Sequence, residues 1–272
     1  MKYKILLQLL IKKKEVTMLY QMIDKLCEQI NKIDAVAELP QFAAQVRKMR
    51  PNLNNELLSQ GILEKELNKS IMTMSFAQLV LIKNIPSIAD ELTKILKVQN
   101  INAAYRCSVA ACLAYLVNPK DLLPDNLPGG YGFIDDFLLL QEACALSWEI
   151  SGDMKKAEER RKIFQFTFMF VPESRREEFQ TAINSLTTTF NIMRALDPIL
   201  AEMTIQMLIQ NPLQEISQQS HSFGSLSPFK SQFSEFSKNY RPQYSWQNGN
   251  TMGINFPGGG GVAADSSGVY IL

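Results

Sequence analysis

Four aspartates in one short, proline-rich stretch are the residues best suited to chemistry. They are Asp121, Asp125, Asp135 and Asp136. Carboxylates grouped in this way, together with loop carbonyls and water, suit a hard divalent cation such as Mg²⁺ or Ca²⁺, or a basic group on a partner. Their spacing matches no EF-hand loop. The stretch is therefore one candidate site for a cation or partner contact.

A stiff turn is the other interpretation of the same stretch, and the sequence favours it. Aspartate side chains close turns by accepting backbone N–H groups. Asp135 and Asp136 open a predicted helix, where the dipole favours a carboxylate, whereas Asp121 and Asp125 follow a helix end and must find donors. Proline fixes φ and lowers the entropy lost when a loop becomes ordered. The expected structural residues of the turn are Pro119, Pro124, Pro128 and Gly132.

Two predicted helices position this turn. Asn102 can cap a helix that runs to about residue 117, and apolar residues return at helical spacing over residues 133–150. A short connection makes two such helices antiparallel neighbours. We therefore expect the four aspartates at one end of a helical hairpin.

This arrangement resembles the YkvA-like domain family, a domain of unknown function, over about residues 102–145. The resemblance implies a helical hairpin and a connection to membranes; it supplies no reaction and no catalytic residues. Asn126 departs from the family pattern, as does the slightly longer spacer Gly129-Gly130-Tyr131. The matching residues are Tyr115, Leu116, Pro119, Asp121, Leu122, Pro124, Asp125, Pro128, Gly132, Asp135 and Asp136.

The remaining pattern predicts an all-α protein, an irregular multi-helix bundle. Residues 18–33 carry one apolar stripe at three- and four-residue spacing, and Pro40 is expected to open a short helix. We divide the chain into a lead segment (1–17), an N-terminal helical region (18–100), the hairpin (101–152), C-terminal helices (153–211) and a tail (212–272). Met18 is an alternative start to Met1.

The two ends of the chain differ from this helical body. The tail is rich in Ser, Gly and spaced aromatic residues, which is typical of a low-complexity segment that builds no core alone. We expect it to be either flexible or docked onto a partner or sister subunit. The lead segment is basic and apolar but lacks a cleavage site, which favours a membrane-surface contact over a signal peptide. No apolar run reaches the ~18 residues of a spanning helix.

Charge and composition exclude several function classes. The 28 basic and 27 acidic residues give a net charge of +1, which argues against nucleic acid as a partner. The single histidine, His221, lies in the tail, so a Ser-His-Asp or Cys-His site is not expected. The four cysteines form no metal-ligand pair and are expected to be buried free thiols in a reducing compartment, the cytoplasm. The chain also lacks a phosphate-binding loop.

These observations favour a non-enzymatic interaction or scaffold protein without a cofactor or small-molecule substrate. Its expected partner is another protein or a second copy of the chain. One alternative is a cation-binding site or cation-dependent enzyme at the aspartates, with Mg²⁺ or Ca²⁺ as the ion. Another is a protein peripheral to a membrane.

Overall fold

The structure is a helical body with a small sheet at one end, which confirms the all-α prediction for the body. The computed structural model describes residues 18–98, 100–118, 122–212, 243–247, 251–255, 261–265 and 268–271. The lead segment, Pro119, Asp121 and His221 lie outside these residues. The α-helices are α2 (Met18–Asn31), α3 (Ala35–Met49), α4 (Leu53–Ser59), α5 (Leu67–Ile82), α6 (Ile85–Lys97), α7 (Ala103–Leu116), α8 (Ile134–Ser151), α9 (Met154–Phe168), α10 (Arg176–Arg194) and α11 (Pro198–Gln210). Short 3-10 helices are η1 (Glu64–Glu66), η2 (Pro128–Phe133) and η3 (Glu173–Arg175).

Helix α2 confirms the apolar stripe, and α3 corrects one predicted boundary. The buried residues of α2 are Leu19, Ile23, Leu26 and Ile30. The prediction that Pro40 opens a helix is wrong, because α3 begins at Ala35 and Pro40 lies inside it. The Asp34 side chain accepts the N–H groups of Val36 and Ala37 at 2.9 and 3.2 Å. This N-cap lies upstream of Pro40 and determines where the helix starts.

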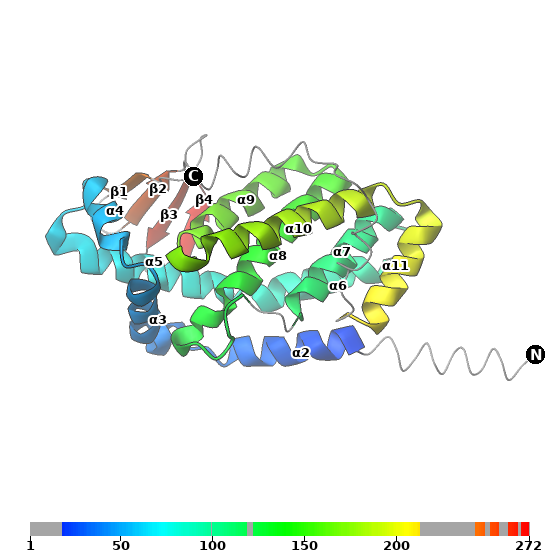
Figure 1. Ribbon diagram of the computed structural model, residues 1–272, viewed down its shortest axis with the longest axis horizontal. Coiled ribbons are helices and arrows are strands. Elements are labelled where there is room, and N and C mark those ends of the chain that lie inside the picture. The colour runs from blue at the N-terminus through cyan, green and yellow to red at the C-terminus, as the bar shows by residue number, and fades with distance from the viewer. Residues whose placement is uncertain are drawn as a thin grey trace, which may run out of the picture.

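The hairpin helices α7 and α8 form the centre of the body. They pack against each other, and α6, α9, α10 and α11 pack around them (Figure 1). Most residues of both helices are buried, 11 of 14 in α7 and 13 of 18 in α8. Helices that are buried on most sides belong in the middle of a bundle. The hairpin is therefore covered by helices from both flanking regions of the chain.

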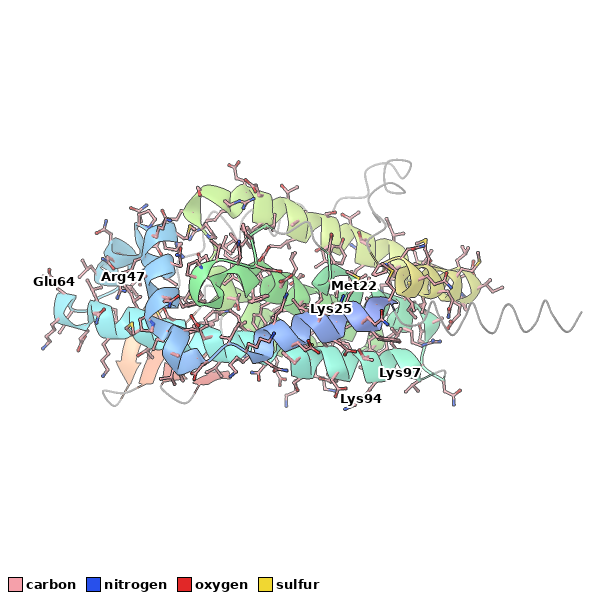
Figure 2. The ribbon with its side chains drawn as sticks, turned by 90° about the horizontal axis from the view of Figure 1, so that it is seen from below. Met22, Lys25, Arg47, Glu64, Lys94 and Lys97 are labelled. Carbon is pink, nitrogen blue, oxygen red and sulfur yellow. The ribbon has the colours of Figure 1, made fainter. Side chains whose placement is uncertain are left out.

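Helices α5 and α6 belong to a stretch that the sequence analysis did not identify as a candidate membrane span. The stretch Glu64–Lys97 is long and apolar enough, by length and composition, to cross a membrane. However, 56% of its most apolar window is buried inside the protein, as in the core helix of a soluble protein. In Figure 2, α6 lies beside α2, and its Lys97 ammonium lies 5.2 Å from the centre of the Tyr20 ring. This stretch is only weak evidence for a membrane span.

The tail contributes a four-stranded antiparallel sheet that the sequence analysis did not predict. The strands β1 (Gln243–Gln247), β2 (Thr251–Asn255), β3 (Gly261–Asp265) and β4 (Gly268–Ile271) lie in chain order. Strands β2, β3 and β4 contact α5, and β3 and β4 also contact α9. Met252 is fully buried in the hydrophobic core. The tail thus adds to the core of the helical body, at the opposite end of the molecule from α11 (Figure 1).

Candidate functional site

The two arms of the predicted hairpin pack closely, as the sequence analysis expected. Asn102 caps α7 by accepting the N–H groups of Ala104 and Tyr105 at 2.8 and 3.2 Å. The buried Cys112 thiol of α7 is within hydrogen-bonding reach of Cys144 on α8, and burial raises the pKa of Cys112 well above its ordinary value. Both are free thiols, as is buried Cys107, whereas Cys27 is half-buried. The arms therefore meet through small apolar and thiol side chains.

Gly132 allows the turn between these arms to fold back on itself. A Cβ atom at this position would lie 2.3 Å from the Pro124 carbonyl oxygen and 2.7 Å from the Cα of Asp125. Real Cβ atoms do not approach backbone atoms this closely, so only glycine fits. The two ends of the turn thus touch through their backbones.

The aspartates occupy different positions in this turn. Asp135 is 2% exposed, and its Oδ2 accepts the Leu123 N–H at 2.8 Å, which ties the turn to the first turn of α8. Asp136 is also buried in that first turn. Asp125 is exposed, although partial burial of its carboxyl raises its pKa. In the described part of the chain, no three His, Cys, Asp or Glu side chains are arranged to hold a metal ion. Because Asp121 is outside that part, the cation site stays a prediction.

Two further glycines lie where the turn packs against α3. Gly129 and Gly130 have φ values of +73° and +76°, in the left-handed region that favours glycine. A Cβ on Gly129 would lie 2.4 Å from the Phe42 backbone nitrogen. The next residue, Tyr131, is buried, and its hydroxyl donates to the Phe170 carbonyl at 2.5 Å. The longer spacer noted in the sequence therefore provides a close contact with α3.

The comparisons with known proteins agree with this geometry. Residues 106–140 match the model of a family described as a protein of unknown function, DUF1232. The matched segment spans most of α7, the turn and the start of α8, and it confirms the resemblance for the hairpin region only. Neither the curated proteins nor the solved structures gave a match.

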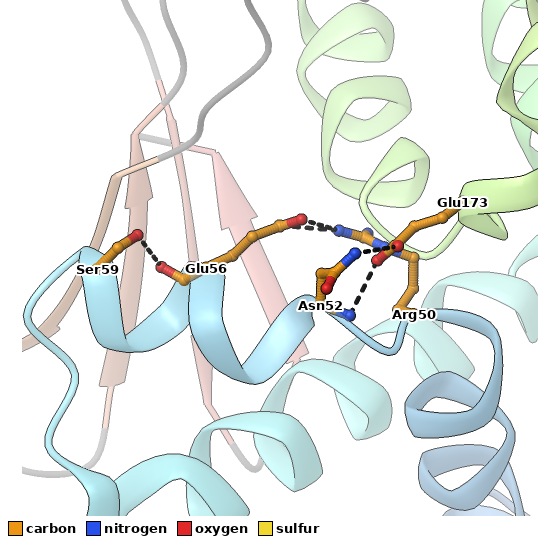
Figure 3. Close-up of polar contacts among 5 residues, drawn as sticks. All are labelled: Arg50, Asn52, Glu56, Ser59 and Glu173. Carbon is orange, nitrogen blue, oxygen red and sulfur yellow. Dashed lines mark hydrogen bonds and ion pairs between the residues drawn. The ribbon is translucent and has the colours of Figure 1, made fainter.

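An ionic cluster around the buried Arg50 (Figure 3) lies outside the matched segment and is connected to the turn of this DUF1232-like hairpin. Arg50, only 2% exposed, donates through Nη2 to both Glu56 oxygens at 2.9 and 2.8 Å and through Nε to Glu173 at 3.3 Å. Glu173 also accepts the backbone N–H and side-chain amide of Asn52, at 3.2 and 2.7 Å. The cluster joins the α3–α4 junction to η3.

Arg175 carries this connection on to the hairpin. It lies two residues after Glu173 in η3, and its guanidinium donates to the Leu122 carbonyl. It also pairs with Glu178 at 2.5 Å. The sequence analysis missed Arg50, Glu173 and Arg175, because nothing in the sequence pairs residues so far apart. A single turn of 3-10 helix thus links the N-terminal helices to the loop of the hairpin.

Glu142 is a second group that the sequence analysis missed. It lies on α8, is fully buried, and neither of its carboxylate oxygens has a hydrogen-bond partner among the described residues. Burial raises the pKa of Glu142 to about 7; nearby Arg161 opposes this rise, and Glu149 adds to it. Arg161 donates to Glu149 at 2.5 Å, so its charge is already paired. Glu142 is therefore a buried carboxyl that titrates near neutral pH.

We predict that Gly132→Ala lowers the free energy of unfolding by about 2–4 kcal/mol, because the new methyl group would clash with fixed backbone. Urea denaturation measures this change. The matched control is Gly152→Ala at the end of α8, where φ is +84° but the space is open, so about 1 kcal/mol should be lost. Equal losses in the two variants would contradict the close approach.

We also predict that Glu142→Gln removes a pH dependence of stability. The unfolded carboxyl titrates near its ordinary pKa of 4.5, whereas the folded one titrates at about 7. Between these values the folded state holds a proton that the unfolded chain has released, so stability falls as pH rises. From pH 5 to pH 8 the native chain should lose about 3 kcal/mol relative to Glu142→Gln.

Thermal and urea unfolding at several pH values measure this effect. Glu158→Gln, at a mostly exposed position on α9, is the control and should leave the pH profile unchanged. Parallel profiles for the native chain and Glu142→Gln would show that Glu142 has an ordinary pKa.

Proposed function

We propose that the chain is a non-enzymatic interaction protein in which a rigid helical body supports a C-terminal contact module. In this proposal, residues 213–272 carry the contacts to a partner chain or to a sister subunit. The observation that carries it is the position of the sheet, which is held by α5 and α9 on the side of β3 and β4. Strand β1 is the opposite edge of the sheet.

The use of the acidic residues supports this proposal. Asp135 closes a turn, and Glu56 and Glu173 neutralise a buried arginine. Groups held in this way stabilise the fold and are not free to exchange protons with a substrate. The carboxylates described at the hairpin and at the Arg50 cluster therefore serve architecture better than catalysis.

Removing the C-terminal segment tests the proposal. A chain that ends at Pro212 should keep its helical circular dichroism but lose its assembly with other chains. Light scattering measures the molar mass of the assembly, and pull-down with a tagged copy of the chain measures how much partner protein it binds. The melting temperature should also fall, because the deletion uncovers α5 and removes the buried Met252 side chain. Unchanged assembly in a folded truncated chain would refute the role of the segment.

A second candidate, a peripheral membrane contact, is supported by exposed aliphatic side chains on α11. Ile199 is 75% exposed and Met203 is 64% exposed, and Leu200 lies between them. Helix α11 contacts α2, which follows directly after the basic and apolar lead segment. An exposed aliphatic surface and a basic segment in one chain are the combination that binds anionic lipid.

Flotation with vesicles of phosphatidylcholine and phosphatidylserine tests this second candidate. Changing Ile199 and Met203 together to Ser should lower the bound fraction at least ~10-fold, because each buried aliphatic side chain contributes ~1.5–3 kcal/mol. Deletion of residues 1–17 should have a similar effect. Val36→Ser on α3, where the side chain is 73% exposed, is the matched control and should bind normally. Binding that survives both changes would exclude this surface.

A further inference from the structure

Strand β1 has one edge that the described residues leave open. Strand β2 pairs with it in antiparallel register, from Gln243 opposite Asn255 to Gln247 opposite Thr251. Among the described elements, β2 is the only one that β1 contacts extensively. The outer side of β1 therefore presents backbone N–H and C=O groups without another described strand beside them, at the end of the molecule remote from α11 (Figure 1). Such an edge can accept another strand.

The composition of β1 does nothing to block an added strand. Proteins protect open edges with Lys, Pro, bulges or inward-pointing charges. The five residues of β1, Gln-Tyr-Ser-Trp-Gln, contain neither a charge nor a proline. Its pairing with β2 is continuous over all five positions, without a bulge. The edge is short but regular and neutral.

The side-chain types of β1 follow the same order from either end of the strand. Ser245 is central, with Tyr244 and Trp246 on its two sides and Gln243 and Gln247 at the ends. If two copies of β1 pair antiparallel about Ser245, every position faces its own kind: amide with amide, aromatic with aromatic, and hydroxyl with hydroxyl. Aromatic and hydroxyl pairs across strands are favourable, and a two-fold axis requires such self-complementarity. A second copy of this chain therefore fits the edge better than an arbitrary peptide.

We propose that β1 pairs antiparallel with β1 of a second copy, with the two Ser245 residues on the two-fold axis, so that both sheets become one continuous sheet. This proposal rests on the proposed function, since it names the partner and the register of the C-terminal module. Five residues on each side make a small interface, at the weak end of protein associations. The dimer should therefore form reversibly and depend on protein concentration.

Cysteine cross-linking tests the register directly. In a Cys27→Ser background, Ser245→Cys places two thiols opposite each other, at the Cα separations of about 4.5–5.5 Å that suit both strand pairing and a disulfide. Mild oxidation should give a covalent dimer. The matched control is Gln243→Cys, because position 243 faces position 247 of the other copy and its own copy is several residues away. Gln243→Cys with Gln247→Cys should restore cross-linking. Equal cross-linking of Ser245→Cys and Gln243→Cys would overturn the proposed register.

A charge at the axis tests the association itself. Ser245→Lys places two ammonium groups opposite each other only in the dimer, so sedimentation velocity should show at least a tenfold weaker association with an unchanged melting temperature. Ser245→Thr keeps the hydroxyl and a strand-favouring side chain and should associate like the native chain. Full association of Ser245→Lys would refute the proposal.

The two proposals fail in different ways. If Ser245→Lys still assembles while the chain ending at Pro212 does not, the C-terminal segment binds through another surface, and only the β1 pairing is lost. If the truncated chain also assembles, the contact role of the segment is lost as well. Cross-linking to a protein other than a second copy would replace the self-pairing with binding of a foreign strand.

Discussion

The backbone contact between Gly132 and the Pro124–Asp125 peptide is the constraint on which the rest of the body depends. It allows the chain to fold back between the end of α7 at Leu116 and the start of α8 at Ile134, so that both arms lie in the centre of the bundle. The Asp135 carboxylate then fixes the same turn by accepting the Leu123 N–H. Because α6, α9, α10 and α11 all pack on these arms, their positions follow from the angle that this turn sets.

The turn is also held from outside, by groups distant in sequence. Gly129 meets the backbone of Phe42, and η3 connects Arg50 with the Leu122 carbonyl through Glu173 and Arg175. A buried arginine without a carboxylate partner would be costly, because its charge would lack compensation. Arg50 has two carboxylates, which makes the cluster a specific link between the N-terminal helices and the hairpin. The hairpin segment that matches the family is therefore packed into a larger helical body.

The sequence predicts well the features that depend on residues close together in the chain, and it predicts poorly the contacts between residues far apart in the chain. The Asn102 cap, the stripe of α2 and the helical hairpin depend on residues near each other in the chain, where spacing carries the information. Pro40 misled the analysis because the nearby Asp34 cap is the stronger start signal. Arg50 and Glu173 are 123 residues apart, so no periodicity connects them. The strands of the tail are only four or five residues long, and three of the four contain a glycine, which hides their alternation.

The placement of charge distinguishes the interior of this protein from the surfaces that we propose for contacts. The buried Asp135 closes a turn, Glu56 and Glu173 neutralise the buried Arg50, and burial raises the pKa of Glu142 to about 7. Two features without a partner among the described residues lie at the two ends of the long axis: the exposed aliphatic side chains of α11 and the outer edge of β1. Two surfaces at opposite ends would suit the proposed role in joining other components, because what binds at one end would leave the other accessible.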